Sequence, residues 1–355
     1  MMNYTGLFTP YKLHRPLTEK EKSEQFHQGK WRKVKFIMDE NSVIKMNAVY
    51  METVCKYYQG KGIASSMLSI LTFGLLLMVL YGSAYSIYAT LFDGRPFRWE
   101  GSIIIIIFTI SAEYFLMRLL HKEWFRKTHY PIRFNRRNQM VYVYQVNGQI
   151  LSVPWYKVFF TAAMSRGAMS EWGIDGHILA DDGETVINTF SLAVSVMGSK
   201  NLLGEYWEFI RCYMEEDCVA DLADIVTLCP PVENKKEGFI FGLQYLLKMD
   251  SRLEWIFLPI MLPLALLASI GRYIAMQTSK IPQWSQEVLD ACQPDPDDPI
   301  NVSAENNPEH LWRYVLANEK REEYEIRHAR QTAANERIKA KLDARYGKKK
   351  NNADE

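Results

Sequence analysis

Acidic residues and one histidine between positions 175 and 182 have side chains that could hold a metal ion. Alternation along a strand places Asp175 and His177 on one face, but no third ligand accompanies them. Asp181 and Asp182 precede Gly183, an order typical of a tight turn in which aspartate bonds the nearby backbone. We therefore expect a solvated hairpin turn here, without a metal.

A second acidic cluster contains Asp295, Asp297 and Asp298. It lacks the additional oxygen ligands and the glycine that a calcium loop requires. The chain also has no nucleophile-elbow, Walker, dinucleotide-binding or H-E-x-x-H motif. We therefore predict a protein that is not an enzyme and has no cofactor.

Glu113 is an ionisable residue inside an apolar run that covers residues 101–120. A carboxylate at membrane depth is costly and is often functional. Two interpretations remain open. Glu113 is either a structural or interfacial group near the cytoplasmic end of a helix, or the functional group of a small transporter or channel subunit that must oligomerise.

Two apolar runs predict a transmembrane hairpin over residues 62–120. Residues 62–92 contain no charged side chain, and roughly 20 apolar residues suffice to cross a bilayer. We predict helices at about 64–90 and 101–120, joined by a short, turn-rich connector. Neither run has the polar face of a soluble helical hairpin.

Lysines and arginines flank both ends of this hairpin, whereas the connector contains only Arg95 and Arg98. The positive-inside rule therefore places both long flanks in the cytoplasm. The basic residues after the second helix either enforce this topology or also contact anionic lipid headgroups. The candidates for headgroup contact are Arg126, Lys127, Arg133, Arg136 and Arg137.

A third apolar run begins at Trp255 and contains Pro259 and Pro263. We predict a membrane segment over residues 251–276, extended past Arg272 if that side chain snorkels. A kinked spanning helix would place the tail, residues 277–355, outside the cell. The alternative is a re-entrant or interfacial segment that keeps the tail in the cytoplasm.

Residues 121–250 predict a cytoplasmic β-rich domain. Alternating strands flank Asn147-Gly148, the strongest short hairpin signal, and a second hairpin turns at residues 181–183. An apolar stripe at three- and four-residue spacing predicts a helix over residues 201–216. Hairpins closed by a C-terminal helix suggest an α+β membrane protein whose domain is of the pleckstrin-homology type, by analogy.

The remaining segments are polar. Residues 1–61 are expected to form a cytoplasmic arm, poorly ordered over its first 30 residues. The tail has a sparse apolar stripe and predicts a solvated single helix, with docking to a partner as the alternative. The five cysteines have no paired spacing and are expected to be reduced thiols. A net charge of +1 argues against nucleic-acid binding.

Four segments together resemble a family of bacterial inner-membrane proteins of unknown function that is commonly encoded near type VI secretion effector genes. They are YPIRFNRR at 130–137, VYV at 141–143, VPWYKV at 153–158, and WSQEVLDAC at 284–292 followed by DPDDP. The resemblance transfers no catalytic residues. It implies an inner-membrane protein with a role in secretion or in self-protection against a cognate toxin. Because a membrane anchor and a compact β domain occur without a catalytic motif, we expect an immunity or accessory factor that binds another protein, a secreted effector or a secretion component.

Overall fold

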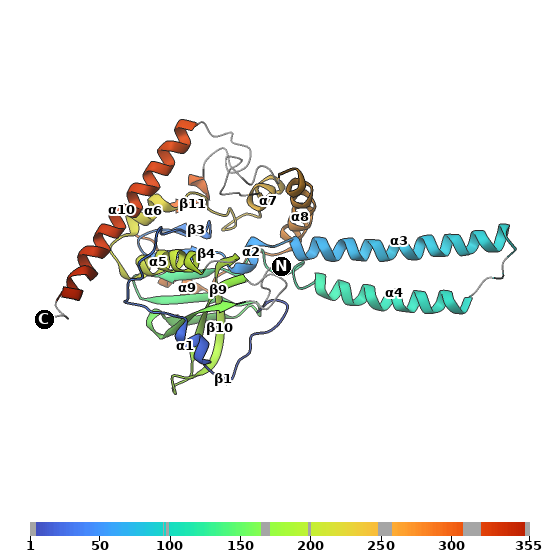
Figure 1. Cartoon of the computed structure of the whole chain (residues 1–355), viewed down its shortest axis with the longest axis horizontal. Helices are drawn as coiled ribbons and strands as arrows, with labels where there is room; N and C mark the ends of the chain where they lie inside the picture. The colour runs from blue at the N-terminus through green and yellow to red at the C-terminus, as the bar shows by residue number, and fades with distance from the viewer. Residues whose placement is uncertain are drawn as a thin grey trace.

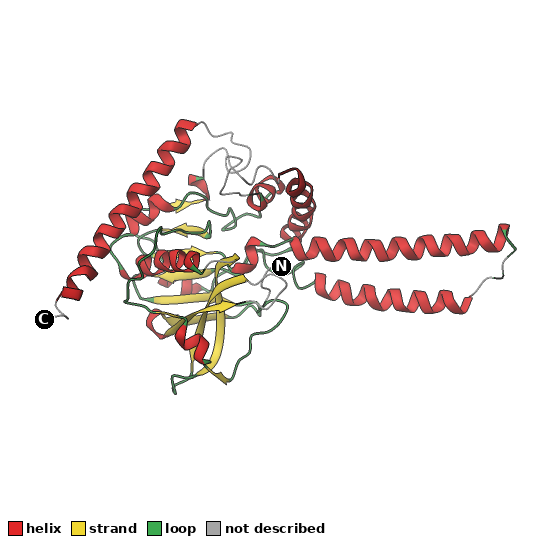
Figure 2. Cartoon of the chain, in the orientation of Figure 1, coloured by secondary structure: helices red, strands yellow, loops and turns green. Residues whose placement is uncertain are grey.

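The computed structural model describes residues 5–94, 96, 99–164, 171–197, 200–247, 258–307 and 321–351. These residues form an α+β structure, as the sequence predicts. The strands gather in one body, and two long helices project from one side of it (Figures 1 and 2). Another long helix lies on the opposite side (Figure 1). The strands form two sheets, and every pairing within them is antiparallel.

The larger sheet contains, in spatial order, β11 (Val302–Ser303), β3 (Val43–Met46), β4 (Tyr50–Thr53), β5 (Ile132–Asn135), β6 (Met140–Tyr144) and β7 (Ile150–Pro154). β6 and β7 form the hairpin predicted around Asn147 and Gly148. Gly148 has a φ of +88°, which a glycine adopts without the clash that a Cβ would cause. The local turn signal therefore sets the register of this hairpin.

The smaller sheet contains, in spatial order, β1 (Arg15–Pro16), β10 (Thr185–Met197), β9 (Glu171–Leu179), β8 (Val158–Met164) and β2 (Gln25–Phe26). The short 3-10 turn η1 (Trp155–Lys157) carries the chain from β7 to β8 and so joins the two sheets. β9 and β10 form the second predicted hairpin, which turns at Gly183 with a φ of +71°.

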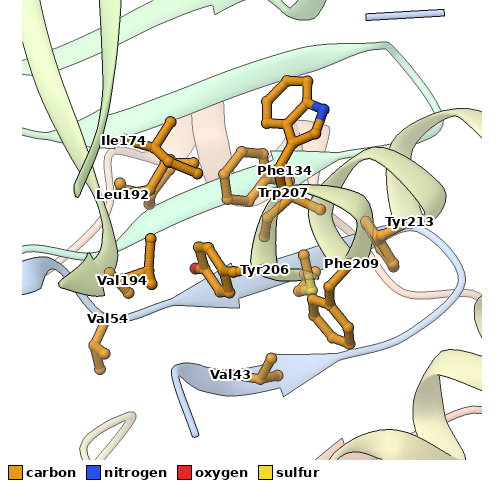
Figure 3. Close-up of a cluster of buried hydrophobic side chains, with 14 of the residues drawn as sticks. Val43, Val54, Phe134, Ile174, Leu192, Val194, Tyr206, Trp207, Phe209 and Tyr213 are labelled. Carbon is orange, nitrogen blue, oxygen red and sulfur yellow. The ribbon is translucent and has the colours of Figure 1, made fainter. Parts of the chain in front are cut away.

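The predicted helix appears as α5 (Asn201–Glu215), whose apolar face closes the core between the sheets. Tyr206, Trp207 and Phe209 are at most 1% exposed and point among side chains from both sheets (Figure 3). The indole of Trp207 stacks on that of Trp155 with ring centres 5.5 Å apart. Burial of large aromatic side chains is a main source of stability in such a core. All five cysteines are free, as predicted, and each of them is buried.

The N-terminal segment belongs to the folded body, and the arm predicted for residues 1–61 is therefore wrong for the described residues. β1 and β2 lie at the two edges of the smaller sheet, while β3 and β4 lie inside the larger one. Two short helices, α1 (Glu19–Ser23) and α2 (Lys56–Gln59), complete the segment. The sequence did not reveal these edge strands, because two residues are too few for an alternating pattern. Their partners are also distant in the chain, since Gln25 pairs with Thr161.

The two projecting helices are α3 (Ile63–Phe92) and α4 (Trp99–Leu120), close to the predicted spans. Arg95 and Arg98 of the connector lie outside the described residues. This helical hairpin interrupts the chain between β4 and β5, which are nevertheless neighbours in the larger sheet. The sheet therefore closes directly beneath the helices, and the membrane segments are an insertion into the β-rich body.

Helices α6 (Val219–Ile225), α7 (Phe239–Leu246) and α8 (Leu258–Thr278) follow α5. The described residues contain three helices long and apolar enough to cross a membrane, namely α3, most of α4 and most of α8. Trp255 and the rest of residues 248–257 lie outside the described residues. Figure 1 shows α8 nearly end-on while α3 and α4 run across the view, so α8 crosses them at a steep angle.

The tail folds back onto the body through α9 (Gln286–Ala291), β11, the 3-10 turn η3 (Ala304–Asn306) and α10 (Arg321–Asn351). Ala334, Ile338 and Leu342 of α10 are buried in the main core. The side chain of Asn335 accepts a hydrogen bond of 2.7 Å from the backbone N–H of Ile37. The solvated single helix predicted for the tail is therefore wrong for this part of α10. The tail residues Leu311, Tyr314 and Val315 lie outside the described residues.

The prediction that a spanning third segment places the tail on the opposite side of the membrane from the β-rich domain is also wrong. β11 pairs with β3, and Cys292 is buried against Tyr50 and Tyr142 of the larger sheet. Segments that share a sheet and a core cannot lie on opposite sides of a bilayer. The sequence misled because an apolar run of sufficient length does not reveal whether its two ends emerge on different sides.

Removing the buried contact of the tail should destabilise the whole body. Ile338 is fully buried, whereas Ile326 on the same helix is 71% exposed. The same substitution at Ile326 is therefore a matched control. We expect Ile338→Ala to lower the free energy of unfolding by about 2–5 kcal/mol, because it leaves a cavity. Ile326→Ala should change it by less than about 0.5 kcal/mol. Thermal unfolding in detergent measures both, and equal midpoints would contradict the packing of α10.

Candidate functional site at the membrane junction

The start of α3 is held by a carboxylate from the turn that follows α4. Glu123 is 3% exposed, and its two oxygens accept hydrogen bonds from the backbone N–H groups of Gly62 at 2.7 Å and Ser65 at 3.0 Å. A helix leaves its first N–H groups unpaired and has a positive N-terminal dipole, so a buried carboxylate satisfies both. Glu123 therefore links the inner ends of α3 and α4.

Lys61 lies buried next to this cap. Its ammonium donates to the carbonyl of Lys127 at 2.9 Å and, less closely, to that of Glu123 at 3.4 Å. Burial lowers the pKa of Lys61 to about 8, and the neighbouring Glu123 opposes this effect. The Lys61 ammonium thus ties the residue before α3 to the backbone that follows α4.

A buried arginine joins α8 to the same junction. Arg272 is fully buried and forms a bidentate pair with Glu237, with Nε and Nη2 at 2.6 and 2.8 Å from the carboxylate oxygens. Its Nη1 donates to the carbonyl of Tyr58 at 2.8 Å. The Tyr58 hydroxyl donates to Glu237 at 2.6 Å, and its ring centre lies 4.7 Å from the guanidinium. A buried ion pair is tolerated when every hydrogen-bonding position is used in this way.

Two glycines allow α3 and α8 to approach each other at this point. Gly62 has a φ of +95°, and a Cβ there would lie 2.3 Å from the Arg272 backbone. A Cβ on Gly271 would lie 2.1 Å from the Ser66 hydroxyl oxygen. That hydroxyl oxygen lies 3.0 Å from the carbonyl oxygen of Leu267 across the crossing and 2.6 Å from that of Gly62. Small residues at a crossing let two backbones come this close.

The segments that leave α4 and α8 also pair with each other. The backbone N–H of Thr128 donates to the carbonyl of Lys280 at 3.0 Å, and that of Lys280 donates to Arg126 at 2.9 Å. The inner ends of α3, α4 and α8 are therefore fixed to one another and to the base of the larger sheet. We call Lys61, Gly62, Glu123, Glu237 and Arg272 the junction cluster.

Glu113 lies on α4, about 10 Å along the helix from Leu120 at 1.5 Å per residue. Its Oε1 is buried and has no hydrogen-bond partner within the described residues. The hydroxyls of Ser69 and Thr72, on α3, are likewise buried and unpaired there. Helices α3 and α4 pack against each other as a hairpin. Both helices of this hairpin therefore carry buried polar atoms that have no partner among the described residues.

The five basic residues proposed for headgroup contact lie in three different places. Arg126 and Lys127 lie in the turn directly after α4, where Arg126 is exposed. Arg133 is buried in a 2.6 Å ion pair with Glu52, so it is not available to a lipid. Arg136 and Arg137 follow β5 at its far end, and Arg137 pairs with Asp295. Headgroup contact stays a prediction for Arg126 and Lys127.

The residues considered for metal binding have other partners. His177 Nδ1 lies 2.9 Å from the hydroxyl of Thr189, and Asp175 accepts a hydrogen bond from Ser191. Asp182 accepts from the backbone N–H groups of Glu184 and Thr185 at 2.9 and 2.8 Å, as expected for a turn. Across the part of the chain that the structure describes, no group of three metal-ligating residues occurs.

The second acidic cluster also acts as a turn. Asp298 accepts hydrogen bonds from the backbone N–H groups of Ala48 at 2.6 Å and Ile300 at 2.9 Å. The carboxylate of Asp295 forms an ion pair with Arg137. These contacts attach the tail to the turn between β3 and β4, so the acidic residues have a structural role.

Sequence reasoning missed the two carboxylates of the junction cluster. Glu123 had a usable signal, because a carboxylate stands three residues after an apolar helix among basic residues. Glu237 had none, since its partner Arg272 is 35 positions away and a pairing at that distance leaves no local pattern. Snorkelling of Arg272 toward water was the condition for extending the third apolar run to residue 276, whereas this side chain is fully buried and ion-paired.

A sequence family described as "Family of unknown function (DUF6708)" matches residues 109–296. The match covers more than half of the 355 residues and runs from within α4 to just after α9. It therefore includes Glu123, Glu237 and Arg272 of the junction cluster. No curated protein and no solved structure matches the chain.

The glycine crossing offers a matched pair of substitutions. Gly62→Ala should lower the free energy of unfolding by about 2–4 kcal/mol, because its φ disfavours a side chain and the Cβ would collide with the backbone of α8. Gly74→Ala, in the middle of α3, meets no atom within 4 Å and should be neutral or slightly stabilising. Thermal unfolding in detergent compares them. A Gly62→Ala protein as stable as Gly74→Ala would refute the close crossing.

Acid sensitivity should come partly from His129, which is 2% exposed beside the junction cluster. Burial, with Lys61 as a second cause, lowers the pKa of His129 to about 3 from its usual 6.5. Between these two pH values His129 is protonated in the unfolded chain but neutral in the folded chain. The free energy of unfolding therefore decreases as pH falls from about 6.5 toward 3. The slope is about 1.4 kcal/mol per pH unit. His129→Gln should flatten this loss in unfolding measured against pH. An unchanged slope would exclude His129 as the cause.

Proposed function

We propose that this chain, which belongs to the DUF6708 family of unknown function, is a membrane-anchored, non-enzymatic protein that binds another protein. The observation that carries the proposal is the insertion of α3 and α4 between the neighbouring strands β4 and β5. A domain attached in this way has little freedom relative to its helices. It therefore presents a fixed surface at a set distance from the bilayer.

The proposed location is the bacterial inner membrane, with the β-rich body and the tail in the cytoplasm. The excess of Lys and Arg on both flanks of the α3–α4 hairpin supports this orientation. In this arrangement α7 and α8 form a re-entrant or interfacial element that returns to the same side. Its support is the packing of Leu243 in α7 and Leu247 directly after it against Ala265 of α8, with the ring centres of Phe239 and Tyr273 6.1 Å apart.

A pleckstrin-homology-type arrangement is part of the proposal. Its support is the order of elements: β4 to β7 are successive neighbours in one sheet, β8 to β10 are neighbours in the other, and α5 follows. Strands β1, β2, β3 and β11 are additions to that order. Such a scaffold commonly serves as a binding module, although fold analogy by itself does not assign a partner.

The proposed setting is immunity to, or handling of, a type VI secretion effector, and it comes from the resemblance of the segments around residues 130–158 and 284–299. A second candidate function is an oligomeric transporter or channel subunit. It is favoured by the unpaired Glu113 oxygen and the unpaired hydroxyls of Ser69 and Thr72 within the described part of the hairpin. Intramembrane ionisable groups often mark ion or proton pathways.

One competition experiment separates the two functions. A strain that lacks this gene but keeps the neighbouring effector gene should be killed by its parent, and the wild-type gene should restore survival. Glu113→Gln, which removes the ionisable group and keeps the shape, should restore survival equally if the protein acts by binding. The control strain lacks the effector gene as well.

Survival of the deletion strain among effector-producing siblings would remove the immunity proposal. Protection by the wild type but not by Glu113→Gln, at equal protein levels, would instead favour transport. A pull-down from cells crosslinked before lysis then identifies the partner, and recovery of the effector with the wild-type chain is the expected result.

A further inference from the structure

A cavity of about 650 Å³ opens beside the membrane junction. It lies between the N-terminal residues 6–13, the β6–β7 turn, β10 and the turn after α4. Sites for small organic ligands have about this volume. The N-terminal wall is tied to the junction, because Lys122 donates to the carbonyl of Phe8 at 2.8 Å and Tyr57 donates to that of Thr5 at 2.5 Å.

The charge of this cavity favours an anion. Lys122 and Arg126 line it, and no aspartate or glutamate is among its lining residues. Arg126 uses Nε to bond the carbonyl of His121 at 3.1 Å, and its two terminal nitrogens have no partner within the described residues. A guanidinium with a free pair of N–H groups is suited to bidentate binding of a phosphate.

A buried cation lies behind the wall and strengthens this preference. The ammonium of Lys56 lies 5.4 Å from the ring centres of both Tyr11 and Tyr57, which line the cavity. Lys56 is 4% exposed, and its Nζ has no hydrogen-bond partner within the described residues. Behind the same wall, Asp175 accepts a hydrogen bond from the hydroxyl of Ser191. The Ser191 hydroxyl also lies 2.7 Å from that of Tyr11.

The rest of the lining is mixed. Apolar side chains from several elements contribute, namely those of Leu7, Leu13, Ile132, Val143, Val146 and Phe190. Hydroxyl and amide groups from β10 and the β6–β7 turn line it as well. A ligand that fills such a space has both polar and apolar parts.

The position of the cavity relates it to the bilayer. Lys122 and Arg126 lie two and six residues after Leu120, the last residue of α4. Phe125, between them, has a φ of +58° and is 60% exposed, although a bulky residue rarely adopts that conformation. An exposed phenylalanine flanked by cations at the end of a membrane helix fits the headgroup region.

We propose that this cavity binds one anionic phospholipid, with the phosphate at Arg126 and Lys122 and the glycerol and upper chains against the apolar and tyrosine walls. The proposal rests on the membrane placement of α3 and α4 given above. A soluble organic phosphate offers the same anion, but it lacks an apolar part to cover Leu7 and Phe190. It also gains nothing from a cavity that opens beside the bilayer.

Native mass spectrometry of the purified full chain in detergent tests the proposal. With added phosphatidylglycerol we expect one bound lipid per chain, and weaker binding of phosphatidylcholine. Arg126→Gln should weaken phosphatidylglycerol binding roughly tenfold, the effect of one charge-assisted hydrogen bond. Lys157→Gln is the matched control, because Lys157 is exposed beyond the end of β7 that pairs with Met140, away from the junction. It should leave binding unchanged.

Val146→Trp provides a second variant that leaves the charges intact, since Val146 lines the cavity and is only partly buried. It should prevent the one-to-one complex while the thermal midpoint stays that of the wild type. Three results would each overturn the proposal. The first is equal binding of the two lipids, and the second is an equal loss of phosphatidylglycerol binding in Lys157→Gln and Arg126→Gln. The third is displacement of the lipid by an equal concentration of glycerol 3-phosphate. These results are read on purified protein, so they do not depend on the competition experiment. Recovery of the chain in the soluble cell fraction would instead refute its membrane placement.

Discussion

The pair formed by Arg272 and Glu237 is the interaction on which the rest of this structure depends. Both side chains are withdrawn from solvent at the point where α8 crosses α3. Leaving one partner of a buried pair uncompensated costs roughly 3–5 kcal/mol, so the pair constrains geometry strongly even if its net contribution to stability is small. Arg272 also bonds the carbonyl of Tyr58, which lies between β4 and α3, and Glu237 precedes α7. Three helices and the segment that follows β4 therefore share a single arrangement.

This arrangement explains why the membrane segments and the β-rich body act as one unit. Glu123 caps α3 from the turn after α4, so both helices of the hairpin end at the same fixed point. The cavity adjoins this point, because Lys122 and Arg126 line it and belong to the same turn as Glu123. A partner bound to the body, or a lipid bound in the cavity, would therefore act on elements that are mechanically continuous with the hairpin.

Sequence reasoning succeeded where the determining interactions are local. The hairpin at Gly148 and the helix over residues 201–215 follow from turn chemistry and from an apolar period, both contained within about 15 residues. It failed where contacts join distant segments. β4 pairs with β5 across the whole membrane hairpin, and Asn335 bonds Ile37 almost 300 positions away. Ile338 and Leu342 form a stripe too short to distinguish a docked helix from a solvated one, and only the surface of the body decides between them.

The central claim is that the tail and the β-rich body lie together on one side of the membrane and the α3–α4 connector on the other. Single cysteines introduced as Asp93→Cys in the connector and Tyr324→Cys on α10 test it with a membrane-impermeant maleimide. Both positions are exposed, and the five native cysteines are buried, so the wild-type chain gives the background. We predict labelling of position 93 in intact cells and of position 324 only after lysis. Labelling of position 324 in intact cells under the same conditions would contradict the account.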